Sequence, residues 1–150
     1  MKISVQKIIV EDTIKLLQDA GNSSSERMVL WLGQRKKAEI AIHELLLPRQ
    51  KATEVSIRIP QKGMKEIFDK VRAERLMVAA QVHSHPEKAF HSYTDDCLAV
   101  PRHEGAISLV LPNFAFDTTL ENFFDEVACF RLSDNDEWKQ VNIHDCVKFC

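Results

Sequence analysis

Residues 82–96 read VHSHPEKAFHSYTDD and place nitrogen and oxygen ligands suited to a metal ion directly after an apolar run. The apolar run, residues 77–82, is predicted to be a buried strand that delivers the histidines. His83 and His85 are two residues apart, so both imidazoles leave the same side of the sheet if the strand continues through them. Asp95 can supply a third, oxygen ligand. Three protein ligands with an open fourth position are typical of catalytic zinc, whereas a closed structural site needs four.

The order His83-x-His85-Pro86 followed by Ser92-x-x-Asp95 resembles the JAMM motif, also called JAB or MPN+, of zinc metalloproteases. The ending Ala-Phe-His-Ser-x-x-Asp-Asp is similar to a bacterial, deubiquitinase-like subgroup. This resemblance implies that His83, His85 and Asp95 bind one catalytic Zn²⁺ ion and that Ser92 stabilises the oxyanion. Six residues lie between His85 and Ser92, one fewer than in the usual family pattern. If the shorter loop displaces Ser92, we expect Ser84 or a backbone amide to donate instead.

A carboxylate stands at the entrance of another apolar run, residues 27–33, which ends in a glycine. In JAMM proteins the catalytic glutamate, which handles the proton of the zinc-bound water, occupies the start of such a strand. The resemblance therefore implies that Glu26 is the catalytic base. Glu39 is the alternative.

The remaining pattern predicts one α/β domain over residues 1–150, with a mixed, mostly antiparallel sheet flanked by two main helices. Strands are expected at residues 3–10, 27–33, 36–47, 53–59, 77–82, 106–111, 126–132 and 138–143. The two main helices are expected from a cap at Asp12 or Thr13 to Gly21, and at residues 61–75. A short helix at residues 92–100, capped by Ser92, would carry Asp95. The resemblance implies the JAMM/MPN fold, with a layering similar to that of cytidine deaminases.

The charge balance argues against a nucleic-acid partner. Twenty basic and twenty-two acidic side chains give a net charge of −2, and no long block of one sign occurs. The amino terminus has no apolar signal core, and no run approaches the ~20 apolar residues of a membrane helix. We therefore expect no membrane contact and a cytoplasmic location.

The cysteines do not form a disulfide or zinc-finger pattern. Cys97, Cys129, Cys146 and Cys150 include no Cys-x-x-Cys pair, so reduced thiols are expected. His144, Cys146 and Cys150 lie close enough in sequence for a second metal site, but their spacing is not a recognised zinc spacing. Incidental cysteines near the carboxyl terminus are the preferred interpretation.

The resemblance implies a zinc-dependent isopeptidase or peptidase that cleaves after the C-terminal tail of a ubiquitin-like protein, in deconjugation or precursor processing. Activating or conjugating (E1/E2-like) proteins of a bacterial conjugation or antiviral operon are the expected partners. Two alternatives stay open. One is a non-catalytic MPN-type scaffold or binding module, and the other is a small-molecule metallo-amidase.

Overall fold

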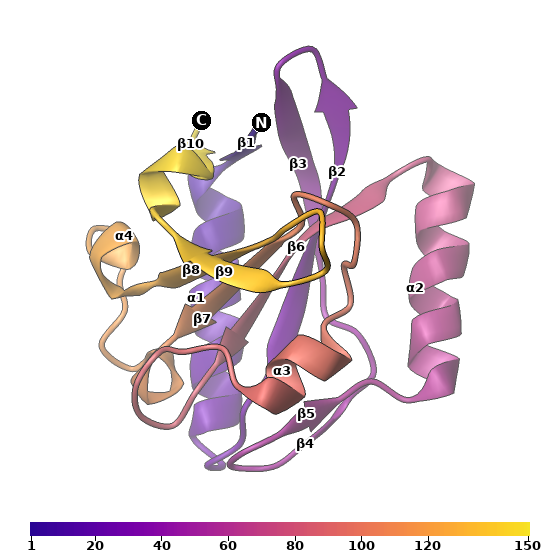
Figure 1. Ribbon diagram of the computed structural model, residues 1–150. Helices are drawn as coiled ribbons and strands as arrows, with labels where there is room; N and C mark the ends of the chain where they lie inside the picture. Colours follow the sequence, from indigo (N-terminus) through magenta and orange to yellow (C-terminus); the bar gives the residue numbers. More distant parts are fainter.

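An eight-stranded sheet forms the centre of the molecule (Figure 1). The computed structural model describes residues 1–150, except for the side chains of Thr94 and Cys97. The strands follow one another across the sheet in the order β10-β1-β3-β2-β6-β7-β8-β9. Their bounds are β1 Lys2–Val5, β2 Met28–Lys36, β3 Glu39–Leu46, β6 Met77–Ser84, β7 Ile107–Leu111, β8 Ala128–Leu132, β9 Trp138–Val141 and β10 Val147–Phe149. Two further strands, β4 (Lys51–Ala52) and β5 (Ile57–Arg58), form a separate sheet.

Most neighbouring strands of the large sheet are antiparallel. Only β1 with β3, β1 with β10, and β6 with β7 run parallel among the described pairs. The helices are α1 Lys7–Gly21, α2 Gln61–Glu74, α3 Tyr93–Leu98 and α4 Phe123–Glu126, with 3₁₀ turns η1 Asn113–Ala115 and η2 Ile143–Asp145. The predicted mixed α/β fold with two main helices is therefore confirmed. None of these helices is long and apolar enough to cross a bilayer.

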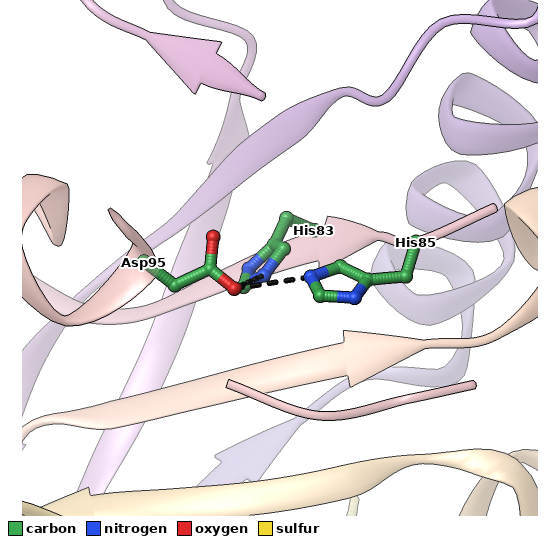
Figure 2. A group of neighbouring side chains, drawn as sticks. All are labelled: His83, His85 and Asp95. Atoms are coloured by element: carbon green, nitrogen blue, oxygen red, sulfur yellow. Dashed lines mark hydrogen bonds and ion pairs between the residues drawn. The ribbon is translucent and has the colours of Figure 1, made fainter. Parts of the chain in front are cut away.

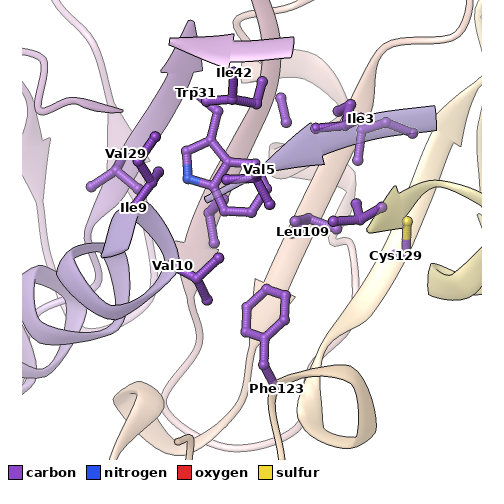
Figure 3. Packing of buried hydrophobic residues seen from close by; sticks show 14 of the residues in the cluster. Ile3, Val5, Ile9, Val10, Val29, Trp31, Ile42, Leu109, Phe123 and Cys129 are labelled. Carbon is purple, nitrogen blue, oxygen red and sulfur yellow. The ribbon is translucent and has the colours of Figure 1, made fainter. Parts of the chain in front are cut away.

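Helix α1 covers one face of the large sheet, and the larger hydrophobic cluster lies between them (Figure 3). Ile9, Val10, Ile14 and Leu17 of α1 are buried in the same cluster as Trp31 of β2. The indole Nε1 of Trp31 donates to Thr13 Oγ1 over 3.0 Å, and the Thr13 hydroxyl donates to the carbonyl of Ile9 over 2.7 Å. Both buried polar groups are thus paired, which removes the cost of burying them.

Helix α2 occupies the opposite face of the sheet. Successive residues of a strand point to opposite sides, so Met28, Leu30 and Leu32 turn away from α1 and pack in a second cluster with Ile67 of α2. The predicted helix at residues 61–75 is confirmed, and it ends at Arg75 in a left-handed conformation (φ 56°). The large sheet therefore separates α1 from α2.

The prediction of a strand at residues 3–10 is confirmed for residues 3–5 and was wrong for residues 6–10, and the predicted helix start at Asp12 or Thr13 was also wrong. The first strand ends at Val5 and residues 7–21 are helical, with Gln6 rather than Asp12 or Thr13 at the N-cap. Short apolar runs such as residues 8–10 fit a strand or a buried helix equally well. The helix is favoured because Ile9, Val10, Ile14 and Leu17 then share one buried face.

The strand predicted at residues 53–59 was also wrong. Only Ile57–Arg58 is paired there, with Lys51–Ala52, and the connecting residues form a turn in which Thr53 N–H donates to the carbonyl of Ser56. Val55 is 75% exposed, although it belongs to the alternating apolar set. Of this set, only Ile57 is buried, in the cluster with Met28, Leu30 and Leu32 of β2, and Ile59 packs against that cluster. The other predicted strands are present within a few residues of their expected bounds.

Candidate metal centre

The two motif histidines lie at the end of β6, in the middle of the large sheet. His83 is paired with Met28 of β2 on one side and Val110 of β7 on the other. His85 follows the last residue of β6, and its N–H donates to the carbonyl of Leu111 over 2.9 Å. The two imidazole ring centroids are 5.2 Å apart, as the two-residue spacing predicts. The pairing of β6 with β2 and β7 thus holds the two imidazole rings close to each other.

The Asp95 carboxylate comes from the first turn of α3. Ser92 is the N-cap of this helix, as predicted, and forms a capping box with Asp95. The Asp95 N–H donates to Ser92 Oγ over 3.0 Å, and the Ser92 N–H donates to Asp95 Oδ2 over 2.9 Å. These two bonds fix the direction in which the carboxylate points.

The three side chains converge on one carboxylate oxygen (Figure 2). Asp95 Oδ2 lies 3.0 Å from His85 Nε2 and 3.3 Å from His83 Nε2. One ligand atom from each residue lies within 4.8 Å of the other two. Across the described side chains, no other three His, Cys, Asp or Glu residues gather in this way.

The chemistry of these three residues fits a metal ion. The His83 side chain is fully buried, yet neither of its ring nitrogens makes a hydrogen bond: Nδ1 has no partner, and Nε2 has only the 3.3 Å ion-pair contact with Asp95 Oδ2. Leaving a buried polar atom unpaired costs about 1–3 kcal/mol, so such atoms require an explanation. A cation bound between two imidazoles and a carboxylate supplies the missing partner, and two nitrogens with one oxygen suit Zn²⁺.

The Asp95 carboxyl is held in its ionised form. Burial raises its pKa, but the histidine nitrogens beside it and the Ser92 N–H lower it more, so the pKa lies well below its usual range. A carboxylate that accepts several N–H groups is expected to behave in this way. Asp95 therefore presents a negative charge at the point where the ligand atoms meet.

Glu26 lies beside the histidine end of β6. Arg27 and Ser84 exchange hydrogen bonds, and Met28 is paired with His83, so the antiparallel register places Glu26 opposite His85. Glu26 is only 3% exposed. Its pKa is raised to about 7, chiefly by burial. The charge of His85 lowers this pKa, and the charge of Asp95 raises it. A carboxyl group with a pKa near neutrality is suited to proton transfer.

The two candidate serine donors differ in position. The Ser92 hydroxyl accepts one bond from the Asp95 N–H, which leaves its own O–H able to donate. Ser84 sits between His83 and His85, so its side chain points to the other side of the strand. Its Oγ accepts from the Arg27 N–H over 3.1 Å. The geometry therefore favours Ser92 over Ser84.

Two sequence alternatives lie elsewhere. Glu39 begins β3, is paired with Lys36 at the far end of β2, and bonds Lys148 over 2.8 Å. His144 stacks on Phe124, and Cys146 is buried with Arg131 donating to its Sγ over 3.1 Å. His144, Cys146 and Cys150 do not gather as a ligand group. Cys129, Cys146 and Cys150 are free thiols, and the Cys97 side chain lies outside the described part.

Sequence reasoning missed one residue of the site. His91 lies in the loop before α3 with its side chain buried, and its ring makes an edge contact with His83 at a centroid distance of 5.8 Å. Its ring nitrogens bond Asp96 and Ser108. A polar residue, Gln81, inside the apolar run 77–82 was the available signal, since a buried amide needs polar partners.

Comparisons with known proteins give one sequence relative and a related fold. No family model matches the sequence. A protein of Sinorhizobium fredii called "Probable metalloprotease y4jG" is 34% identical over 132 residues, which cover 83% of this chain and 78% of the relative. The solution structure of protein DSY2949 from Desulfitobacterium hafniense has a TM-score of 0.72 and 14% identity, and the match covers 99% of this chain and 92% of that one. That second likeness shows a shared fold.

Proposed function

The chain belongs to the same metalloprotease family as y4jG of Sinorhizobium fredii, and from this premise we propose that it is a JAMM-type zinc isopeptidase or peptidase acting on ubiquitin-like proteins. The relative and the His-His-Asp group together indicate a metal-dependent peptidase. The observation that carries the proposal is the convergence of His83, His85 and Asp95 on one oxygen atom. These residues, with Ser92, stand in the order that resembles the JAMM motif.

In this proposal, His83, His85 and Asp95 hold the ion and leave a fourth position open. When bound, Zn²⁺ acidifies a coordinated water and polarises the substrate carbonyl. The backbone holds these ligands from two directions, because β6 carries the histidines and α3 carries the carboxylate. Two rigid elements keep the donor set in place before the ion arrives.

Glu26 is the proposed general base. Its buried carboxyl group, with a pKa near 7, can accept a proton from the attacking water and deliver it to the leaving amine. Proton transfer of this kind contributes about 10²–10⁴-fold to rate. The charges of both His85 and Asp95 act on this carboxyl group, as expected for a base beside the ligands.

Ser92 is the proposed oxyanion donor. Its backbone position is fixed by the N-cap, so the hydroxyl is held in place without a conformational search. A donor aimed at the developing oxyanion is typically worth about 3 kcal/mol. The capping bond uses a lone pair of the oxygen and leaves the proton for the substrate.

The surroundings of the site suit an extended polypeptide. The Glu26 N–H donates to the carbonyl of Thr53 over 2.9 Å, so the small β4–β5 sheet lies next to the base. A two-stranded sheet leaves strand edges to which an extended tail can add. Phe90, which is half exposed, packs edge-on against His85 at 4.5 Å and offers an apolar contact beside the ligands. These features support an extended polypeptide segment as the substrate, and the resemblance to the JAMM motif is the ground for proposing the tail of a ubiquitin-like protein.

Cleavage assays on ubiquitin-like proteins test the proposal. We would incubate zinc-loaded protein with a ubiquitin-like protein joined to a reporter, either linearly or through a lysine side chain, and measure products by intact mass. The expected product ends at the last residue of the ubiquitin-like tail, and Glu26→Gln should form it at least about 10²-fold more slowly. Cleavage of small amides alone would favour a metallo-amidase. A protein that binds these substrates without cleaving them would favour the scaffold.

A further inference from the structure

His91 links the loop before α3 to the centre of the sheet. Its side chain is 3% exposed, and each ring nitrogen has a partner. Nδ1 bonds the Asp96 carboxylate, and Nε2 lies 3.0 Å from Ser108 Oγ on β7. The imidazole thus connects the first turn of the ligand helix with a strand of the sheet.

The hydrogen bonds continue through two fully buried polar residues. The Gln81 side-chain amide donates to Ser108 Oγ over 2.9 Å, and the Val100 N–H donates to Gln81 Oε1 over 3.0 Å. Gln81 and Ser108 are paired across β6 and β7 and share the face that carries His83. The chain of hydrogen bonds therefore begins at Val100, just after α3, and passes through Gln81 on β6 and Ser108 on β7. It ends through His91 at Asp96 in the first turn of α3.

All donors and acceptors in this network match if His91 is neutral. Gln81 donates to Ser108, the Ser108 hydroxyl then donates to His91 Nε2, and His91 Nδ1–H donates to Asp96. No member is left unpaired, which is the condition under which a buried polar network stabilises a unique arrangement.

Two aromatic rings enclose the imidazole. Phe130 of β8 and Trp138 of β9 lie with their ring centroids 5.1 and 5.2 Å from that of His91. Phe130 is the cross-strand partner of Ser108, so the rings and the hydrogen bonds act at the same place on the sheet. The imidazole is therefore fixed both in position and in rotation.

The helix needs such anchoring because it has only six residues. Isolated helices of that length are not stable in water. Besides the capping box, α3 is tied down by Arg102, whose Nη1 donates to the carbonyl of Asp96 over 2.6 Å. Apart from the Asp95 carboxylate, which faces His83 and His85, the described side-chain contacts that join the α3 region to the middle of the sheet include those of His91 with Ser108 and of Gln81 with Val100.

We infer that His91 is a positioning residue, which holds α3 on the sheet so that the Asp95 carboxylate meets His83 and His85. The inference rests on the proposed function insofar as Asp95 is a metal ligand. The His91 side chain, which is 3% exposed, acts through α3 and not on the substrate in this inference. Its role is to set the separation between the strand that carries the histidines and the helix that carries the carboxylate.

The test compares His91→Leu with His91→Gln. Leucine fills the space but removes both hydrogen bonds, whereas glutamine retains one donor and one acceptor. Zinc affinity, measured by competition with a chromophoric chelator, should fall by about 10–100-fold in His91→Leu. It should recover in part in His91→Gln. His103→Leu is the matched control, because His103 is a half-buried histidine that bonds the carbonyl of Val78 at the other end of β6. It should change zinc affinity by less than about twofold.

A second measurement keeps the inference independent of the metal. In metal-free protein, the amides of Asp95, Asp96 and Val100 should exchange with solvent about tenfold faster in His91→Leu than in wild type, because local opening of α3 becomes easier. Ser108→Ala removes the hydrogen bonds that Ser108 makes with Gln81 and His91 but leaves the bond between His91 and Asp96, so it should show a smaller change in the same direction. Its effect should not add fully to that of His91→Leu, since both act in one network.

These outcomes separate the two proposals. Wild-type zinc affinity together with unchanged amide exchange in His91→Leu would overturn the positioning role. If His91→Leu does not fold, unchanged affinity and exchange in Ser108→Ala would overturn it. If wild-type protein binds no zinc but α3 opens in His91→Leu, the proposed function fails while the anchoring role stands.

Discussion

Ser92 and Asp95 cap each other's backbone, and the oxygen that closes this cap is also the one that faces both histidines. The Ser92 N–H donates to Asp95 Oδ2 over 2.9 Å, and the same Oδ2 lies 3.0 Å from His85 Nε2. The capping box over residues 92–95 therefore sets both the start of α3 and the position of the Asp95 carboxylate. Any change at Ser92 tests the helix and the site together.

Replacing Ser92 should separate its two roles. Ser92→Ala removes the hydroxyl and the cap, so turnover should fall by about 10²-fold and the free energy of unfolding by about 1 kcal/mol. Ser92→Gly retains most of the capping preference, so it should be nearly as stable as wild type and as inactive as Ser92→Ala. Denaturant unfolding and turnover numbers are the measurements. Full activity of Ser92→Gly would assign the oxyanion to another donor.

Replacing Glu26 should remove chemistry without removing metal. Glu26→Gln keeps the shape of the side chain but cannot accept a proton, so turnover should fall by about 10²-fold or more at unchanged zinc content. Glu39→Gln is the matched control, because Glu39 pairs with Lys148 at the far end of β2. A variant series in which Glu39→Gln is inactive and Glu26→Gln is active would reverse the assignment of the base.

The part of the site that sequence alone could predict is the part set by short spacing. His83 and His85 share a side because alternate strand residues do, and Ser92 caps α3 because serine, followed three residues later by aspartate, favours a helix start. Glu26 was reached only through the resemblance to a family. Its position opposite His85 depends on the register between β2 and β6, which no local pattern encodes.

What sequence could not predict depended on long-range partners. The apolar run at residues 8–10 is compatible with a strand or with a buried helix. The helix is favoured because its apolar face packs in one cluster with Trp31 of β2. The alternation at residues 53–59 looked like a strand, but only Ile57–Arg58 finds a partner. His91 escaped notice because its partner Ser108 lies 17 positions along the chain.

The pH dependence of stability should reveal the buried Glu26. Its pKa rises from 4.5 to about 7 on folding, so the folded state holds this proton more tightly than the unfolded state. The stabilisation is full below pH 4.5 and is lost as the pH rises through about 7, a loss of up to ~3 kcal/mol. Glu26→Gln cannot ionise and escapes this loss.

Metal-free wild type and metal-free Glu26→Gln should therefore be compared by denaturant unfolding from pH 4.5 to 7.5. The free energy of unfolding of the variant, minus that of wild type, should increase as the pH rises across this range. A difference that stays constant with pH would mean that Glu26 ionises as freely in the folded protein as in the unfolded chain. Glu39→Gln serves as the control and should follow wild type.

Removal of single ligands should release the metal. His85→Ala or Asp95→Ala leaves two of three protein ligands, so purified protein should lose most of its zinc and all measurable peptidase activity. His144→Ala should retain about one zinc per chain, because His144 stacks on Phe124 and belongs to no ligand group. Metal analysis after gel filtration gives the stoichiometry. Equal zinc content in Asp95→Ala and wild type would remove Asp95 from the ligand set.

The central claim is that His83, His85 and Asp95 hold a catalytic zinc ion, and anomalous diffraction at the zinc edge tests it most directly. Crystals grown with zinc should give one strong anomalous peak, about 2.0–2.2 Å from a nitrogen of each histidine and an oxygen of Asp95. The fourth position should be occupied by solvent. A peak at other residues, or none at these three in well-ordered crystals, would contradict the account.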